Sequence, residues 1–254
     1  MAKTKIAVLV SGGGTNLQAL IDAQGSVLNS GEIVLVVSNA RDAYALERAK
    51  KAGIATETVL KKECGSQGAF EERLKEVLTA HGIELIILAG FMTILTEDFT
   101  SAYPRRILNV HPSLIPSFCG EGFYGLRVHE AALSYGVKVT GATVHFVNEI
   151  PDGGEIIAQR AVYIEEGDTP EVLQRRVMEQ AEWILLPQAA EKVCAGLQKQ
   201  QHIVGRGGAP ADDAKHRNGQ RPFDRHKITL SGNGIQRMPG GASPRPTITG
   251  GQFQ

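Results

Sequence analysis

An asparagine and a histidine stand two positions apart in the segment "NVHPSLIP", which begins at residue 109. The apolar run before it predicts a strand over residues 106–111, and side chains at i and i+2 of a strand project to the same face. Asn109 and His111 would therefore lie side by side where Pro112 ends the strand. A carboxamide can hydrogen-bond an oxyanion, and an imidazole can give or take a proton near neutral pH. A histidine at a strand end is more often structural, but the neighbouring asparagine favours a catalytic role.

A carboxylate partner for this pair is present in "NEIPDGGEII", residues 148–157. Asp152 follows a predicted strand that carries His145, and it precedes two glycines. An aspartate in that position is usually a turn residue. The sequence alone does not bring Asp152 to His111, so its role stays open at this level.

A glycine loop, "SGGGTNL", spans residues 11–17 and follows a predicted buried strand over residues 5–10. A loop between a strand and the N-terminus of a helix offers free N–H groups and the positive end of the helix dipole, which together bind anions. The P-loop pattern is absent. The dinucleotide pattern GxGxxG is incomplete, because Leu17 stands where the third glycine belongs.

The glycine loop therefore favours a single phosphate over a dinucleotide. Thr15 and Asn16 could add side-chain donors beside Gly14. The structural alternative is a tight strand-to-helix turn that needs glycine only for its dihedral angles. On the loop alone, neither interpretation is preferred.

Other chemistries lack their motifs. The segment "HEAAL" at residues 129–133 has no second histidine for the zinc pattern HExxH, and the histidines show no other metal-ligand spacing. No GxSxG nucleophile motif is present, and nothing nearby marks Cys119 as a nucleophile. We therefore expect a reaction that uses no metal.

Strand and helix patterns alternate along the first 200 residues. Near-continuous apolar strands are typical of a parallel sheet covered on both faces. We predict one α/β domain with a doubly wound, mostly parallel, Rossmann-like sheet and helices on both faces. The predicted strands are 5–10, 32–38, 54–60, 83–90, 106–111, 138–148 and 155–164, and the main predicted helices are 15–24, 42–53, 66–82, 127–135 and 169–197.

Open parallel sheets bind their ligands at the carboxyl ends of the strands. The segments 11–16, 90–95 and 109–112 all lie at or just beyond such ends. The predicted fold therefore brings these three segments together at one edge of the sheet.

The chain has 254 residues, of which 42% are hydrophobic and 21% are charged. Its composition changes near residue 203: the first 202 residues carry a net charge of −5, and the remainder carries +5 with 10 glycines and 5 prolines. A segment of that kind cannot bury enough apolar surface to offset its chain entropy. We expect a domain over residues 1–200 and a disordered, basic Gly/Pro-rich tail over residues 201–254.

The three cysteines are far apart and form no CxxC pair, which favours a reducing cytoplasm without disulfides. The N-terminus has no signal-peptide pattern, and no apolar run is long enough to cross a bilayer. Nothing in the charge distribution of the predicted domain indicates a nucleic-acid surface. We expect a cytoplasmic protein that binds neither nucleic acid nor membrane and is a monomer or homodimer.

Five motifs carry a resemblance that covers residues 5–197: "SGGGTNL", "LAGFMTIL", "NVHPSLIPSF", "GATVHFV" and "DGGEIIAQ". In order and approximate spacing they resemble the phosphoribosylglycinamide formyltransferase family, whose members act in purine synthesis. The "HPSLIP" motif is shared with methionyl-tRNA formyltransferases and formyltetrahydrofolate deformylase. The glycine loop is more discriminating, and it begins the chain without the preceding regulatory domain that the deformylase carries.

The resemblance implies a role for each matching residue. It implies that Asn109, His111 and Asp152 are catalytic, with Asp152 raising the pKa of His111 and orienting its ring. The phosphate of glycinamide ribonucleotide would bind at Gly14, Thr15 and Asn16, and its ribose at Glu182. The co-substrate 10-formyltetrahydrofolate would contact Asn109 and the segment formed by Met92, Thr93, Ile94 and Leu95.

The sequence departs from the family pattern in three places. Thr93 stands where the family often has arginine, so a side-chain contact to folate is lost. Gln67 stands where a basic folate-binding residue is common, which weakens its assignment to the folate site. The loop "FCGEGFYGLRVH" is longer than in many members, and the segment after residue 200 matches nothing in the family.

The resemblance implies transfer of a formyl group from the folate to the amine of glycinamide ribonucleotide. A deformylase, which hydrolyses formyl folate without an amine acceptor, is the alternative with the same Asn-His-Asp core. Formylation of an aminoacyl-tRNA would need a basic RNA-binding domain, against which the net charge of −5 argues. A non-catalytic nucleotide- or folate-binding module is disfavoured by the presence of Asn109, His111 and Asp152 together.

Overall fold

A computed structural model of the chain describes residues 2–205. The tail was predicted from residue 201, but residues 201–205 continue the last helix of the domain. From residue 206 on, the predicted tail lies outside the described residues, so its predicted disorder is untested there. Cys64, Cys119 and Cys194 are free thiols. Within the described range, no helix combines the length and the apolar character that crossing a membrane requires.

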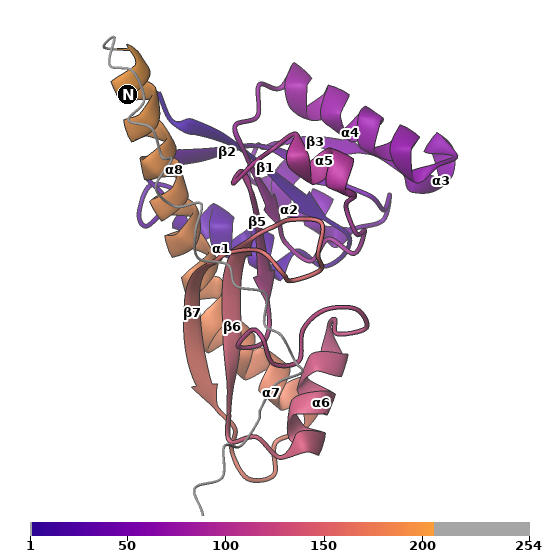
Figure 1. Ribbon diagram of the computed structural model, residues 1–254, viewed down its shortest axis with the longest axis vertical. Coiled ribbons are helices and arrows are strands. Elements are labelled where there is room, and N and C mark those ends of the chain that lie inside the picture. Colours follow the sequence, from indigo (N-terminus) through magenta and orange to yellow (C-terminus); the bar gives the residue numbers. More distant parts are fainter. Residues whose placement is uncertain (1, 206–254) are drawn as a thin grey trace, which may run out of the picture. The chain divides into compact units, whose positions relative to one another are not determined.

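A seven-stranded sheet in the order β3-β2-β1-β4-β5-β6-β7 forms the centre of the fold (Figure 1). The first five strands pair in parallel, whereas β6 runs antiparallel to β5 and β7 runs antiparallel to β6. The predicted doubly wound, mostly parallel sheet is confirmed. The strands are β1 (Thr4–Val10), β2 (Gly31–Ser38), β3 (Ala55–Thr58), β4 (Leu85–Leu88), β5 (Ile107–His111), β6 (Val139–Phe146) and β7 (Ile156–Tyr163).

Helices cover both faces of this sheet. Alternate residues of the inner strands point to opposite faces and pack with these helices in two separate hydrophobic cores. Ile6 and Val8 of β1 pack with α1, α2 and α8, whereas Ala7 and Leu9 pack with α4 and α5. This explains why the first strand is apolar at almost every position. The α-helices are α1 (Thr15–Ala23), α2 (Tyr44–Lys51), α3 (Lys61–Cys64), α4 (Gln67–Ala80), α5 (Glu97–Ser101), α6 (Leu126–Tyr135), α7 (Pro170–Val177) and α8 (Trp183–Gly205).

The single long helix predicted over residues 169–197 is interrupted. A π-helical turn, η1 (Met178–Glu182), separates α7 from α8. α7 begins as its sequence predicts: the Thr169 hydroxyl accepts a hydrogen bond from the Val172 N–H, and Pro170 occupies the first turn. The apolar periodicity continues through the π-turn, and Pro187, which has no N–H for a helical hydrogen bond, lies about one turn further on inside α8.

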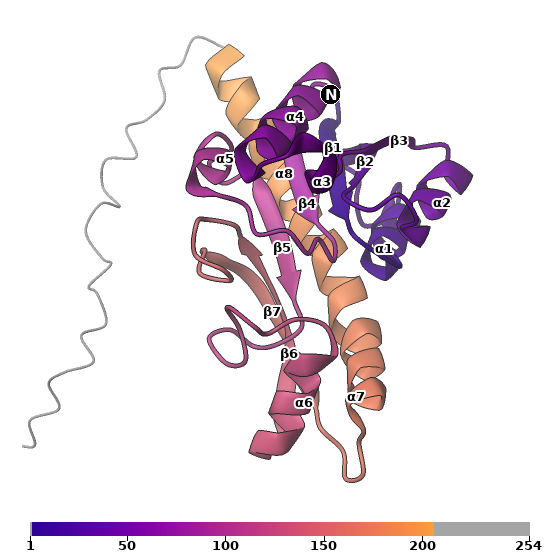
Figure 2. The ribbon, with the colours of Figure 1, turned by 90° about the vertical axis from the view of Figure 1, so that its right-hand side faces the viewer.

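Helices α6 and α7 lie side by side next to β6 (Figures 1 and 2). α6 begins after Gly125 and ends at Gly136, whose left-handed backbone (φ 81°) caps the helix. This pair of helices carries side chains toward the cavity that is described next.

Candidate active site

The carboxyl ends of β1, β4 and β5 meet where the strand order changes direction, with β2 on one side of β1 and β4 on the other. Such a switch point is the usual ligand site of an open α/β sheet. The loops that leave β1 and β4 are joined directly: the Met92 N–H donates to the Ser11 hydroxyl over 2.9 Å. The predicted meeting of segments 11–16, 90–95 and 109–112 is therefore present.

Asn109 and His111 are the third and the last residue of β5, and they lie on the same face of the strand, as their spacing predicts. Asp152 reaches them from the connection between β6 and β7. Its Oδ2 lies 3.3 Å from His111 Nδ1, and its Oδ1 accepts a hydrogen bond from Asn109 Nδ2 over 3.3 Å. The three residues that the sequence proposed for catalysis thus form one contiguous polar cluster, which we call the Asn-His-Asp cluster.

Both ring nitrogens of His111 face acceptors. Nε2 lies 2.8 Å from the Phe118 carbonyl, which cannot donate, so Nε2 carries a proton in this arrangement. Nδ1 lies 3.3 Å from Asp152 Oδ2, so a second proton on Nδ1 would form an ion pair with this carboxylate. Burial nevertheless lowers the pKa of His111 from its ordinary value, because it outweighs the opposing effects of Asp152 and of the Phe118 carbonyl. Asp152 acts to raise the pKa of His111, as the resemblance implies, but burial has the larger effect. The net pKa is therefore lowered and not raised.

Asp152 is held from several sides. It has a left-handed backbone (φ 56°), and its Oδ2 accepts the Gly120 N–H over 2.9 Å. Burial alone would raise the pKa of this carboxyl, but hydrogen bonding to His145, the charge of His111 and the Gly120 N–H together lower it. Asp152 is therefore a carboxylate near neutral pH, and it holds the His111 ring in place.

His145 belongs to the same cluster, although it was not among the residues predicted from the sequence. It stands directly opposite Asn109 in the antiparallel pair of β5 and β6. Its Nδ1 lies 2.8 Å from the Phe146 carbonyl, which fixes the proton on Nδ1 in the neutral ring. In that state its Nε2 accepts from Asn109 Nδ2 at 3.2 Å, whereas in the protonated ring Nε2 donates to Asp152 Oδ1, which lies 3.5 Å away.

The carboxamide of Asn109 is therefore fixed by two acceptors, His145 and Asp152. With both amide hydrogens directed at protein atoms, Asn109 must exchange one partner before it can donate to an oxyanion. In the sequence, only the alternation of "GATVHFV" bears on His145: it places His145 and Thr143 on the same face of the strand.

A second polar pair joins the glycine loop to the π-turn. Asn16 Nδ2 donates to Glu182 Oε2 over 2.7 Å, and the Glu182 side chain is 6% exposed. Burial raises the pKa of Glu182 to about 7, although the hydrogen bond from Asn16 acts in the opposite direction. Glu182 therefore changes charge close to physiological pH.

The Asn16–Glu182 pair and the Asn-His-Asp cluster line the same cavity, which has a volume of about 770 Å³. We call it the central cavity. It is large enough for a substrate-sized molecule. Its walls also include Met92, Thr93, Ile94, Phe123, Tyr124, His129, Gln174 and Met178.

The structure bears on both interpretations of the glycine loop that the sequence left open. Gly14 has φ 71°, and a Cβ built on it would lie 2.6 Å from the Ala45 Cβ, so its glycine is required by the turn itself. Gly12 and Gly13 have open space where a Cβ would stand, so these two leave the backbone approachable. Thr15 begins α1, and its hydroxyl faces Met178 Sδ at 3.9 Å rather than a ligand position.

The segment predicted to bind folate is partly open. Met92 and Ile94 are 56% and 63% exposed, and Thr93 accepts a hydrogen bond from Asn39 over 2.9 Å. Leu95 is 4% exposed and packs in the core that contains α4 and α5. Leu95 instead lines a smaller cavity of about 120 Å³, which Thr93, Ile94, Asn109 and Asp152 also line.

Gln67 supports this segment. Its Nε2 donates to the Ile94 carbonyl over 3.1 Å and to Glu71 Oε1 over 2.6 Å. The same Glu71 oxygen accepts the Thr96 N–H over 2.8 Å. The Gln67 side chain therefore holds the segment around Ile94 in place. Its amide donor is used for this purpose and does not point to a folate ligand.

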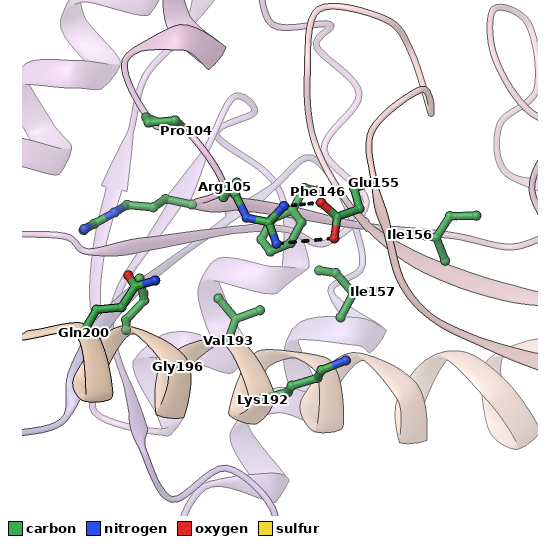
Figure 3. Close-up of a pocket in the computed structure, with 12 residues that line it drawn as sticks. Pro104, Arg105, Phe146, Glu155, Ile156, Ile157, Lys192, Val193, Gly196 and Gln200 are labelled. Atoms are coloured by element: carbon green, nitrogen blue, oxygen red, sulfur yellow. Dashed lines mark hydrogen bonds and ion pairs between the residues drawn. The ribbon is translucent and has the colours of Figure 1, made fainter. Parts of the chain in front are cut away.

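A further cavity of about 420 Å³ lies between the segment before β5, the strands β6 and β7, and α8 (Figure 3). Of the three cations that line it among the described residues, Arg105 forms an ion pair with Glu155, and its guanidinium stacks 4.5 Å from the centre of the Phe146 ring. The other two are Arg106 and Lys192. It contains none of the predicted site residues. Over residues 2–205, no group of three or more His, Cys, Asp and Glu side chains has the arrangement of a metal site.

The sequence profile of the formyl transferase family matches residues 4–189. The chain therefore belongs to the formyl transferase family. The phosphoribosylglycinamide formyltransferase of Escherichia coli is 41% identical to it over 175 residues, which cover 69% of this chain and 80% of that protein. The crystal structure of glycinamide ribonucleotide transformylase 1 from Symbiobacterium toebii matches with a TM-score of 0.72 and 42% identity, covering 76% of this chain and 89% of that one.

Larger proteins also contain this domain. The trifunctional purine biosynthetic protein adenosine-3 of Gallus gallus is 46% identical over 194 residues. That match covers 76% of this chain but only 19% of the trifunctional protein, so the chain spans about a fifth of its length.

Proposed function

We propose that the chain transfers the formyl group of 10-formyltetrahydrofolate to the amine of glycinamide ribonucleotide, a step of purine biosynthesis. The observation that carries this proposal is the central cavity, which joins an anion-binding helix start to the Asn-His-Asp cluster. A nucleotide and a formyl donor would both have to reach that cluster. The named relatives at 41–42% identity support the same activity.

The nucleotide would bind along the glycine loop. Its phosphate would take the free N–H groups at the start of α1, where Gly12 and Gly13 leave room for close approach. The Glu182 carboxylate would accept hydrogen bonds from the ribose hydroxyls, with Asn16 holding it in place. The amine would then extend toward Asn109 and His111.

The formyl donor would approach from the segment 92–94, where exposed apolar side chains could cover a flat ring system. The smaller cavity beside Asn109 offers the adjoining surface. Thr93 already has Asn39 as its partner, so this segment would contact the folate through apolar surface and backbone groups.

The amine nitrogen attacks the formyl carbon, and the carbonyl oxygen becomes an oxyanion. His111 can donate from Nε2 to that oxygen once the Phe118 carbonyl is displaced, and Asp152 beside Nδ1 stabilises the ring when it takes up a second proton. The carbon–nitrogen bond to the folate then breaks, and the proton lost by the amine compensates the one gained by the folate nitrogen. Holding both substrates in one cavity supplies much of the rate.

A deformylase remains the second candidate, because the same cluster could direct water at the formyl carbon. The Asn16–Glu182 pair favours the transferase, since a hydrolase has no use for a nucleotide acceptor site in the same cavity. The proposed setting is the cytoplasm, with small-molecule substrates and no metal.

The deciding experiment measures turnover of 10-formyltetrahydrofolate by the purified full chain with and without glycinamide ribonucleotide. The proposal expects tetrahydrofolate and formylated nucleotide in equal amounts, and no appreciable turnover without the acceptor. Formate release at the same rate in both reactions would replace the transferase with the deformylase.

A further inference from the structure

His129 lies on α6 with 0% of its surface exposed, and it lines the central cavity together with His111. Neither of its ring nitrogens has a hydrogen-bond partner within the described part of the chain. Its neighbours on the buried face of α6, Val128 and Ala132, are apolar. A buried imidazole among them is therefore a polar group that the folded protein leaves unsatisfied.

Such a group is unfavourable for folding. Burying a polar side chain without a partner lowers the stability of the fold, and a leucine of similar size in this position would avoid that loss. His129 thus gives the fold no hydrogen bond that explains it. Because His129 lies on the wall of the central cavity, a bound ligand could supply the missing hydrogen-bond partner.

The charge state of His129 restricts which ligand group it can bind. Burial, and the positive charge of a protonated His111 nearby, lower the pKa of His129 to about 4. The ring is therefore neutral at physiological pH and offers one N–H donor and one lone pair. A neutral donor–acceptor pair suits an uncharged polar group better than a phosphate or an ammonium group.

We propose that His129 is a substrate-positioning residue that hydrogen-bonds the carboxamide linking ribose and glycine in glycinamide ribonucleotide. This inference rests on the proposed function. The nucleotide has to reach from the glycine loop and Glu182 to His111, and the carboxamide is the uncharged polar group between its ribose and its amine. His129 lies beside His111 on the wall of the cavity that the nucleotide must cross.

The loop before α6 can adapt to such a contact. Both ring nitrogens of His129 are closed to solvent, so a ligand has to displace part of the lining to reach them. Gly122 and Gly125 line the same cavity, and both have positive φ angles, as does Gly120. Glycines in this region allow the loop to change its backbone with little steric penalty.

The test compares the affinities of glycinamide ribonucleotide and ribose 5-phosphate, which lacks the carboxamide, by calorimetry without folate. In His129→Leu, we expect the dissociation constant of glycinamide ribonucleotide to rise about tenfold, while that of ribose 5-phosphate stays unchanged. In His129→Gln, which keeps a donor and an acceptor, we expect a rise of no more than about threefold. The melting temperature of His129→Leu should equal or exceed that of the wild type.

Thr140→Val is the matched control. The Thr140 hydroxyl is also buried and has no partner among the described residues, but Thr140 does not line the central cavity. Removal of this hydroxyl should leave both dissociation constants unchanged. If removing any unpartnered buried polar group changed ligand affinity, the dissociation constants would change in both variants. If His129 contacts the substrate, they change only in the His129 variant.

Three results would overturn the inference: an unchanged affinity for glycinamide ribonucleotide in His129→Leu, an equal loss for ribose 5-phosphate, or a loss in His129→Gln as large as in His129→Leu. Failure of the proposed function is distinguishable from these, because it would appear in the wild type. A wild-type chain that neither binds nor formylates glycinamide ribonucleotide would overturn both proposals.

Discussion

Asn16 and Glu182 lie 166 positions apart in the sequence and are joined by a 2.7 Å hydrogen bond. The bond ties the glycine loop at the start of α1 to the π-helical turn between α7 and α8. Because the carboxyl is buried and its pKa is raised to about 7, this link changes its charge within the neutral pH range. The site that we assign to the nucleotide is therefore sensitive to pH.

Glu182→Gln should separate stability from binding. A carboxyl whose pKa is raised on folding stabilises the protein below its unfolded pKa of 4.5, and that contribution is lost as pH rises through about 7. At pH 8 the variant should therefore unfold with a free energy higher by at most about 3 kcal/mol. Its affinity for glycinamide ribonucleotide should be about tenfold lower at pH 8, because charged acceptors form the stronger hydrogen bonds.

Calorimetry at pH 6 and pH 8 checks the binding part of this prediction. At pH 6 Glu182 is protonated in the wild type, so the difference in affinity between the two proteins should shrink below about threefold. The phosphate of the nucleotide titrates equally in both experiments and cancels. A tenfold difference that persists at pH 6 would show that the charge of Glu182 is not what the nucleotide recognises.

Gly13→Ala and Gly14→Ala should have opposite consequences. A Cβ at position 13 meets nothing in the protein, so Gly13→Ala should keep the melting temperature and raise the dissociation constant of the nucleotide about tenfold by blocking a phosphate. A Cβ at position 14 meets Ala45 at 2.6 Å on a backbone with φ 71°, so Gly14→Ala should lower stability by about 2–4 kcal/mol. Thermal unfolding and nucleotide titration measure the two effects.

Folate affinity is the control for the glycine variants, because the proposed folate segment leaves a different strand. It should be unchanged in Gly13→Ala. If Gly13→Ala weakened folate and left the nucleotide unaffected, the two binding sites would have to be exchanged.

Substitution of the Asn-His-Asp cluster should reduce kcat far more than binding. Asn109→Ala, His111→Ala and Asp152→Ala should each lower kcat about 100-fold or more, with smaller changes in KM. Near-normal turnover in any one folded variant would remove that residue from the mechanism.

His145→Phe should act more weakly and through Asn109. The variant keeps an aromatic ring but removes the Nε2 acceptor that lies 3.2 Å from Asn109 Nδ2. We expect kcat to fall about tenfold while both KM values stay within about twofold, and His145→Gln to restore part of the rate. Equal rises in both KM values with an unchanged kcat would instead indicate a general distortion of the cavity.

His129 should make the protein sensitive to acid. Its pKa is lowered to about 4 on folding, so the unfolded chain binds the proton more tightly, and this residue destabilises the fold as pH falls from 6.5 to 4. The full effect corresponds to about 3 kcal/mol. Glu182 acts in the opposite direction over nearly the same range, so denaturant unfolding of His129→Leu and the wild type must be compared at each pH. A constant difference between the two proteins from pH 7 to pH 4 would contradict this prediction.

Local patterns in the sequence were sufficient to predict the pairing of Asn109 with His111, because strand alternation is set by neighbouring residues. The glycine loop was also visible, since it follows a strand and precedes a helix. By contrast, the approach of Asp152 depends on the antiparallel return from β6 to β7, and His145 meets Asn109 only through the register of two strands. Register depends on contacts between segments far apart in the chain, so no local pattern encodes it.

The dual character of the glycine loop could not be predicted for a similar reason. Gly14 is required by Ala45, a residue of the next helix, and only the packing of α1 against α2 reveals that contact. The resemblance to a known family, rather than any pattern of charges, suggested Glu182. The π-turn that carries it preserves apolar periodicity on both sides, so the periodicity alone predicts one continuous helix.

That π-turn affects how the glutamate can be recognised in other chains. A π-helical turn holds about one residue more than an α-helical turn, so one residue can be added or removed there while the helices on either side keep their directions. A protein with the same site could consequently have one position more or fewer between the residue matching Val177 and the cavity glutamate. A motif written with fixed spacing across this segment would miss such a protein, whereas a search for the hydrogen-bonded Asn–Glu pair in three dimensions would not.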